Sequence, residues 1–135
     1  MATKAAISLL SVGQLLVESA TLAAIDIGAK DATEKYNRAT VALQVAAAFQ
    51  AVQAGDLAGG LAEAQAALLS KITDPGQILL IQGLFTIGNA QIQIASQAAS
   101  AIPLLNATVE GVAGEIAAGI TAIASSYKNP ANKTA

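Results

Sequence analysis

The sequence has 135 residues, of which 54% are hydrophobic and only 12% are charged, and its formal net charge is −2 at pH 7. Ordinary soluble domains have about 25% charged residues, so these charges are too few to cover the surface of a monomer. There is no Cys and no His, which excludes disulfides and thiolate sites and removes the commonest general base and metal ligand. The few cations are scattered, so no nucleic-acid-binding surface is indicated.

The first helix is predicted over residues 3–27. Ser11, Gln14, Glu18 and Thr21 recur at spacings of three and four and form one polar stripe, apolar residues cover most of the rest of the helix, and Gly28 is suited to end it. In outline the segment resembles a signal peptide, with Lys4 ahead of an apolar run. That run is broken by Ser8, Ser11 and Gln14, so we expect a helix of the mature protein rather than a cleaved leader.

Two helices are predicted in the middle of the chain. One spans residues 31–54, because the stretch from Asp31 to Glu34 is typical of a capping box and Val41, Val45 and Phe49 recur at helical spacing. The other spans residues 57–72, although two glycines near its start each cost about 1 kcal/mol of helix stability relative to Ala.

The fourth helix, over residues 75–101, has the clearest start signal. Asp74 is a suitable N-cap, Pro75 occupies the first helical position, and Gln77 completes a capping box. The Ile-rich segment 77–94 also admits a strand, because residues 91–94 alternate Gln and Ile. The strong cap and the sustained spacing of three and four favour the helix. Pro103 ends it, and a fifth helix is predicted over residues 104–127.

These elements predict an all-α protein. We expect an up-down bundle, or an extended array, of four to five alanine-rich helices without a sheet. Residues 1–127 form one helical domain and residues 128–135 form a polar C-terminal tail.

The fourth helix lies in a stretch, residues 75–109, that contains no charged residue. Its polar positions fall on about a third of the helix circumference at 100° per residue. We call these positions the neutral stripe: Gln82, Thr86, Asn89, Gln93, Ser96, Gln97 and Ser100. A helix that faces water usually carries Lys and Glu on its polar side. Neutral amides instead suit a contact with facing helices or the wall of a wet lumen. A soluble bundle with a low-charge surface is the alternative.

The fifth helix carries an apolar stripe that is expected to hold the protomer to a neighbour. This apolar stripe consists of Val109, Val112, Ile116, Ile120, Ile123 and Tyr127.

The sequence contains no constellation typical of an enzyme. Glu110 and Glu115 are five positions apart and do not share a helix face, and the charges around Lys30 are typical of a solvated helix junction with local ion pairs. No catalytic residue, cofactor site or metal ligand is predicted, and neither a small-molecule substrate nor a specific nucleic acid is expected. We therefore expect a protein without enzymatic activity.

In composition the whole chain resembles the small Ala-, Gln- and Gly-rich helical proteins of bacteriophage particles, including those ejected with the genome to form a conduit. No motif carries residue roles over. The resemblance implies a homo-oligomeric structural protein of a virion, such as an internal, tail or ejection protein, or a channel-forming oligomer. The alternatives are a holin-like or pore-forming protein of the inner membrane and a soluble amphipathic coat or scaffold protein.

Overall fold

The computed structural model describes residues 2–52, 57–101 and 108–128, and for residues 2–13, 57–58 and 98–100 it describes the backbone alone. Within these ranges the chain forms five α-helices and no strand. They are α1 (Ala2–Asp26), α2 (Ala32–Gln50), α3 (Leu57–Leu69), α4 (Pro75–Ala101) and α5 (Val109–Tyr127). The all-α prediction is confirmed, and the strand interpretation of residues 77–94 is wrong because they lie inside α4.

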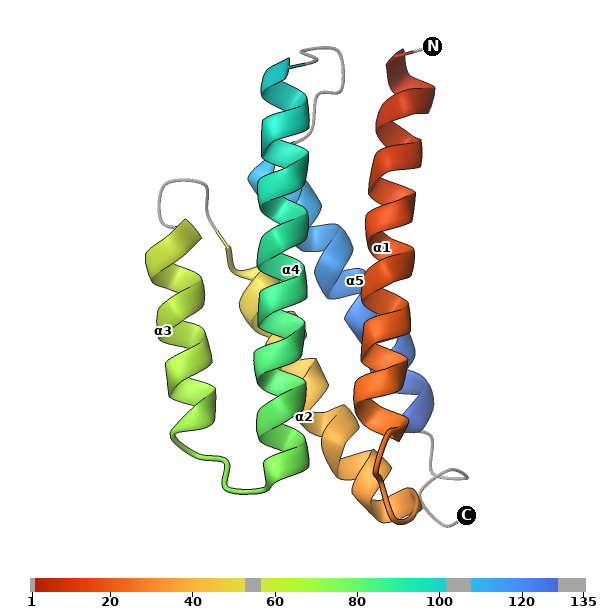
Figure 1. Cartoon of the computed structure of the whole chain (residues 1–135), viewed down its shortest axis with the longest axis vertical. Coiled ribbons are helices and arrows are strands. Elements are labelled where there is room, and N and C mark those ends of the chain that lie inside the picture. The colour runs from red at the N-terminus through yellow and green to blue at the C-terminus, as the bar shows by residue number, and fades with distance from the viewer. Residues whose placement is uncertain (1, 53–56, 102–107, 129–135) are drawn as a thin grey trace.

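The helices alternate in direction along the long axis of the molecule (Figure 1). In that view α1 and α4 form a front layer, α2 and α5 cross behind it at an incline, and α3 lies at one edge beside α4. The most extensive helix contact joins α2 and α5, followed by α1 with α5 and α1 with α4. The fold is therefore an up-down four-helix core, with α3 as an outer helix that packs chiefly on α4 and α2.

The helix ends follow the predicted cap signals at three places. The amide of Glu34 donates to Asp31 Oδ1 at 2.9 Å, and the amide of Gln77 donates to Asp74 Oδ2 at 2.9 Å. These side chains satisfy amides that have no partner within a first helical turn. Gly28, beyond the end of α1, has a φ of 75°, which only glycine adopts without strain.

Two helices end earlier than predicted. α3 ends at Leu69 rather than at residue 72, because the hydrogen bonds after it span three residues instead of four. The amide of Lys71 donates to the Leu68 carbonyl at 3.1 Å. α2 ends at Gln50 rather than at residue 54, and the Val52 amide likewise donates to the Phe49 carbonyl at 3.2 Å. Residues 53–56 lie outside the described ranges.

The bounds of α5 also differ from the prediction. Thr108 has an extended backbone and its hydroxyl accepts the amide of Gly111 at 2.9 Å, so the helix begins at Val109 instead of residue 104. At the other end, Lys128 is not part of a free tail. Its ammonium lies 3.7 Å from the centre of the Tyr36 ring and donates to Thr40 Oγ1 at 2.7 Å, which ties α5 to α2. The rest of the predicted tail, residues 129–135, is outside the described part of the chain.

The core contains two aromatic rings at the contact of α2 with α4. Phe49 is fully buried, and its ring centroid lies 5.3 Å from that of Phe85. Phe49 also lies against Gly88, where a Cβ atom would come within 2.7 Å of Phe49 Cε1. The largest fully buried aliphatic side chains are Ile25, Leu80, Ile81, Leu84, Ile92, Ile116, Ile120, Val17 and Val45.

Candidate functional site

The neutral stripe lies on the surface of the protomer rather than in its core. Gln82, Thr86, Gln93 and Gln97 are exposed, and Asn89 and Ser96 are half-buried. Ser100 lies among the residues whose side chains are not described. Within the described part of the chain, the six described side chains of the stripe form no hydrogen bond. Their donors and acceptors therefore remain available to a partner or to water.

One part of the neutral stripe faces α3 across a groove of about 460 Å³. Leu61 of α3 and Phe85 of α4 are both buried beneath it. Its other lining residues are polar or small: Ala62, Gln65, Thr86, Asn89, Ala90 and Gln93. The groove thus has an apolar base and a rim of neutral polar groups.

A second surface feature adjoins the neutral stripe. It comprises the large hydrophobic side chains that remain exposed in the described part of the chain, and we call it the apolar face. All of them lie on α1, on the turn after α1, or on α4: Leu15, Leu16, Leu22, Ile27, Leu79 and Ile94, which are 45–74% exposed. None lies on the described surfaces of α2, α3 or α5. α1 and α4 form one layer (Figure 1), so the helices that carry these exposed side chains lie beside each other.

The apolar face lies on helices with few charged side chains. α4 has no charged residue, and of the two charged side chains described on α1, Asp26 is paired with its neighbours on α5 and α2. The stem of Glu18 lies over Gly119 of α5. Asp26 accepts a hydrogen bond of 2.6 Å from the Tyr127 hydroxyl and lies 3.5 Å from the Lys35 ammonium. An apolar layer with few charges is the kind of surface that marks a contact with protein or lipid.

Most described charges gather at one end of the bundle, where α1 and α5 end and α2 and α4 begin (Figure 1). This charged end contains every Lys and Arg whose side chain is described. Its members are Asp26, Lys30, Asp31, Glu34, Lys35, Arg38, Lys71, Asp74 and Lys128. The remaining described charges are glutamates: Glu18, Glu63, Glu110 and Glu115. The described side chains therefore form a charged end and a long shaft with few charges.

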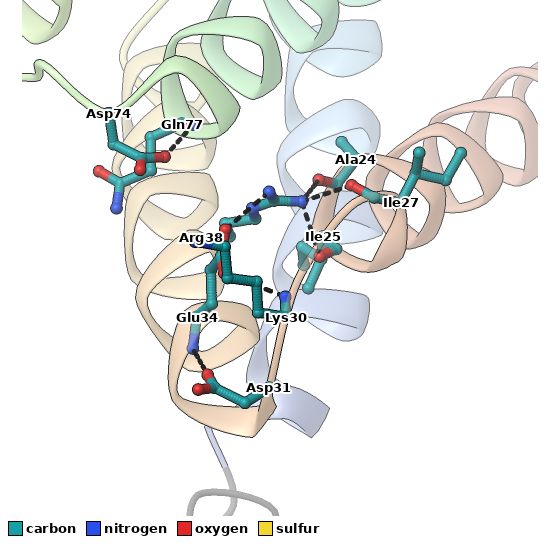
Figure 2. Close-up of polar contacts among 9 residues, drawn as sticks. All are labelled: Ala24, Ile25, Ile27, Lys30, Asp31, Glu34, Arg38, Asp74 and Gln77. Atoms are coloured by element: carbon teal, nitrogen blue, oxygen red, sulfur yellow. Dashed lines mark hydrogen bonds and ion pairs between the residues drawn. The ribbon is translucent and has the colours of Figure 1, made fainter.

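Arg38 is the centre of the charged end, and Figure 2 shows its contacts. Its Nη1 donates to the carbonyls of Ala24, Ile25 and Ile27 at 3.3, 3.2 and 2.7 Å, and its Nη2 lies 3.1 Å from Glu34 Oε1. The guanidinium thus satisfies the free carbonyls at the end of α1, where a positive charge is favourable. Arg38 is only 5% exposed, so the prediction of a solvated junction is wrong for this residue. The predicted local ion pairs are present.

Tyr127 links the end of α5 to α1 at the same end of the bundle. Burial, together with the hydrogen bond to the Asp26 carboxylate and the charge of that carboxylate, raises the pKa of Tyr127 to about 12. The hydroxyl therefore stays protonated and donating at neutral pH.

The structure corrects the expected role of the predicted apolar stripe from Val109 to Tyr127, which lies on α5 and which we call the α5 stripe. Val112, Ile116 and Ile120 are buried in the core of the protomer itself, while Val109, Ile123 and Tyr127 are half-buried against it. The stripe faces α2 and α1, which are the principal contacts of α5. The three buried side chains hold the bundle together and are not available to hold a neighbouring protomer. The sequence showed an apolar stripe, but it could not show that the same chain would cover it.

Glu110 and Glu115 form no paired site. Glu110 is exposed in the first turn of α5, and Glu115 is half-buried further along the helix. Among the residues that the structure describes, no group of three or more acidic side chains is placed to hold a metal ion.

The sequence matches no protein-family model, no curated protein and no solved structure. Within the described residues, one helical segment, Pro75–Gln97, is long and apolar enough to cross a membrane, and 39% of its most apolar window is buried inside the protein. A helix of a soluble core passes the same test of length and composition.

Proposed function

We propose that the protein is a non-enzymatic structural subunit of a multi-copy assembly, in which neighbouring helices cover the apolar face. The observation that carries this proposal is the gathering of all described exposed large hydrophobic side chains on α1, its following turn and α4. Full burial of a Leu or Ile side chain contributes about 1.5–3 kcal/mol. Covering side chains that are 45–74% exposed therefore supplies several kcal/mol for association.

The neutral stripe supports the same proposal. Its unused donors and acceptors can pair with a neighbouring helix without the desolvation penalty of burying a charge. In this assembly the stripe faces either neighbouring helices or a lumen.

The finer proposal is a bacteriophage virion component, either an internal, tail or ejection protein or a channel-forming oligomer. The Ala-, Gln- and Gly-rich composition supports it, and the site of action is then the virion or another assembled particle. A membrane protein of the holin-like or pore-forming class is the second candidate, which the span-length segment Pro75–Gln97 favours. The buried side of that segment belongs to the protomer core. To insert into a membrane, the segment would have to leave the bundle or insert together with the helices that pack on it.

The test is the mass of the purified protein, measured by light scattering over a range of concentrations with and without mild detergent. A multi-copy mass without detergent is expected from the proposal. A single, uniform mass that is obtained only in detergent would support the membrane candidate instead. A monodisperse protomer without detergent at every concentration would overturn the proposal and favour a soluble coat or scaffold protein.

Charge substitutions test the role of the neutral stripe in that assembly. Asn89→Lys and Gln93→Glu each place a charge where the stripe is expected to be covered, so we expect both to reduce the assembled mass. Gln44→Glu is the matched control, because Gln44 is an exposed amide on α2, away from both surfaces. An unchanged oligomer for both stripe variants would count against a closely packed stripe and leave the lumen interpretation.

A further inference from the structure

We infer that the partner of the apolar face is a second copy of the same chain, with the two α4 helices packed antiparallel about a two-fold axis. This inference rests on the proposed function and specifies the contact within the assembly. Four exposed positions of α4 carry it: Leu79, Gly83, Ala90 and Ile94. At 100° per residue they lie within about 60° of one another, so they form one narrow line along the helix.

The order of these four residues is the same when the helix is read in either direction. Leu79 and Ile94 are equally far, about 11 Å, from a point between Thr86 and Ile87 at 1.5 Å per residue. Gly83 and Ala90 are each about 5 Å from the same point. Two large residues thus flank two small ones symmetrically.

A two-fold axis through that point would make the line complementary to its own copy. Gly83 would face Ala90 of the second copy, so the helix backbones can approach closely at the crossing. Leu79 would face Ile94 of the second copy at both ends of the contact. In an isologous interface each such pair occurs twice, so both copies cover both of their exposed aliphatic side chains.

Charge and area agree with the same occupant. α4 has no charged residue, so two α4 helices meet without like-charge repulsion, and each flanking amide can donate to or accept from an amide of the other copy. α1 and α4 are 25 and 27 residues long. At 1.5 Å per residue each is about 40 Å long, and two packed helices are about 20 Å wide, so the layer presents roughly 800 Å². A stable standard-size interface also needs about 800 Å² from each partner.

The absence of natural cysteine makes disulfide trapping a clean test. Gly83→Cys has open space around its new side chain, and Ala90→Cys replaces an exposed residue. In the antiparallel contact the two substituted positions face each other across the interface, whereas each is about 10 Å from its own copy. Disulfides form when the Cα atoms are about 4.4–6.8 Å apart. An oxidised mixture of the two variants is therefore expected to form the mixed dimer roughly tenfold faster than either variant forms a dimer alone.

A charge variant gives an independent readout in solution. Ala90→Arg places two guanidinium groups inside the contact, and we expect association to weaken at least about 100-fold by analytical ultracentrifugation. Ala118→Arg is the matched control, because Ala118 is an exposed alanine in the interior of α5. Equal association of the two Arg variants would overturn the two-fold contact.

The outcomes separate this inference from the proposed function. A multi-copy wild-type mass without preferential mixed disulfide would overturn the two-fold contact and leave the proposed function intact. Fast disulfide formation by each variant alone would indicate a parallel contact, which also overturns it. Co-sedimentation of monomeric protein with phosphatidylglycerol vesicles would show that lipid covers the face and would overturn the second copy as occupant. A monomer without detergent or lipid would overturn both proposals.

Discussion

Gly88→Ala is expected to destabilise the protein, although alanine is the better helix former. An added Cβ at Gly88 would lie 2.7 Å from Phe49 Cε1, and Phe49 cannot move away because it is fully buried against Phe85. Overpacking of this kind costs about 1–3 kcal/mol. The gain in helix propensity from Gly to Ala offsets about 1 kcal/mol of that cost. We expect a net loss of about 1 kcal/mol or more in the free energy of unfolding.

Gly114→Ala is the matched control. Gly114 lies in the interior of α5, and nothing lies within 4 Å of an added Cβ, so only the propensity gain of about 1 kcal/mol applies. Gly114→Ala should therefore be more stable than the wild type and Gly88→Ala less stable. Their free energies of unfolding should differ by about 2–3 kcal/mol. At about 3–4 °C per kcal/mol for a chain of this length, their Tm values should differ by roughly 8 °C.

The assay is thermal and urea unfolding followed by far-ultraviolet circular dichroism. In a Phe49→Leu background the ring is gone, so adding Gly88→Ala should recover stability rather than lose it. The coupling between the two sites should be about 1–2 kcal/mol. A Gly88→Ala protein as stable as the wild type, or one whose loss is the same in the Phe49→Leu background, would refute the proposed contact.

Two further predictions concern the charged end. Arg38→Lys keeps the charge but cannot contact three carbonyls and Glu34 together, so urea unfolding should show a loss of about 2–3 kcal/mol; wild-type stability would contradict the capping role. The pKa of Tyr127 is raised to about 12 by burial, by its hydrogen bond to Asp26 and by the charge of that carboxylate, so the stability it contributes is complete below pH 10 and is lost as pH rises through 12. Tyr127→Phe should therefore destabilise the protein at pH 7 but much less above pH 12. In the Asp26→Asn variant, the pKa of Tyr127, measured by alkaline absorbance titration, should move toward 10. An unchanged titration would contradict the contact between Tyr127 and Asp26.

Local signals predicted the helices well, because they act within one turn. Asp74, Pro75 and Gln77 specify the start of α4 through a single side-chain-to-amide bond, and the structure contains that bond. Gly28 ends α1 through its own backbone conformation. Such signals need no knowledge of the rest of the chain, which is why the fold class and the up-down order were predictable from the sequence.

Tertiary contacts decided what the sequence missed. Nothing near Arg38 in the sequence indicates burial, because the carbonyls that it satisfies are 11 to 14 positions earlier in the chain. The α5 stripe was recognised as apolar but assigned to a neighbour, whereas α1 and α2 cover it within the protomer. The apolar face on α1 and α4 is the converse case. Its residues resemble any apolar stripe until the fold shows which of them remain exposed.

The outer position of α3 gives the fold a weak edge. The other helices form a closed core, and α3 rests on it chiefly through α4 and α2. Local opening in a protein begins where the fewest apolar contacts must be broken. Detachment of α3 would bring Leu61 and Phe85, now almost fully covered, into contact with solvent while the other four helices stay folded. The side of α4 that faces the groove would then expose additional apolar surface. A partially unfolded protomer would therefore aggregate more readily than the native one.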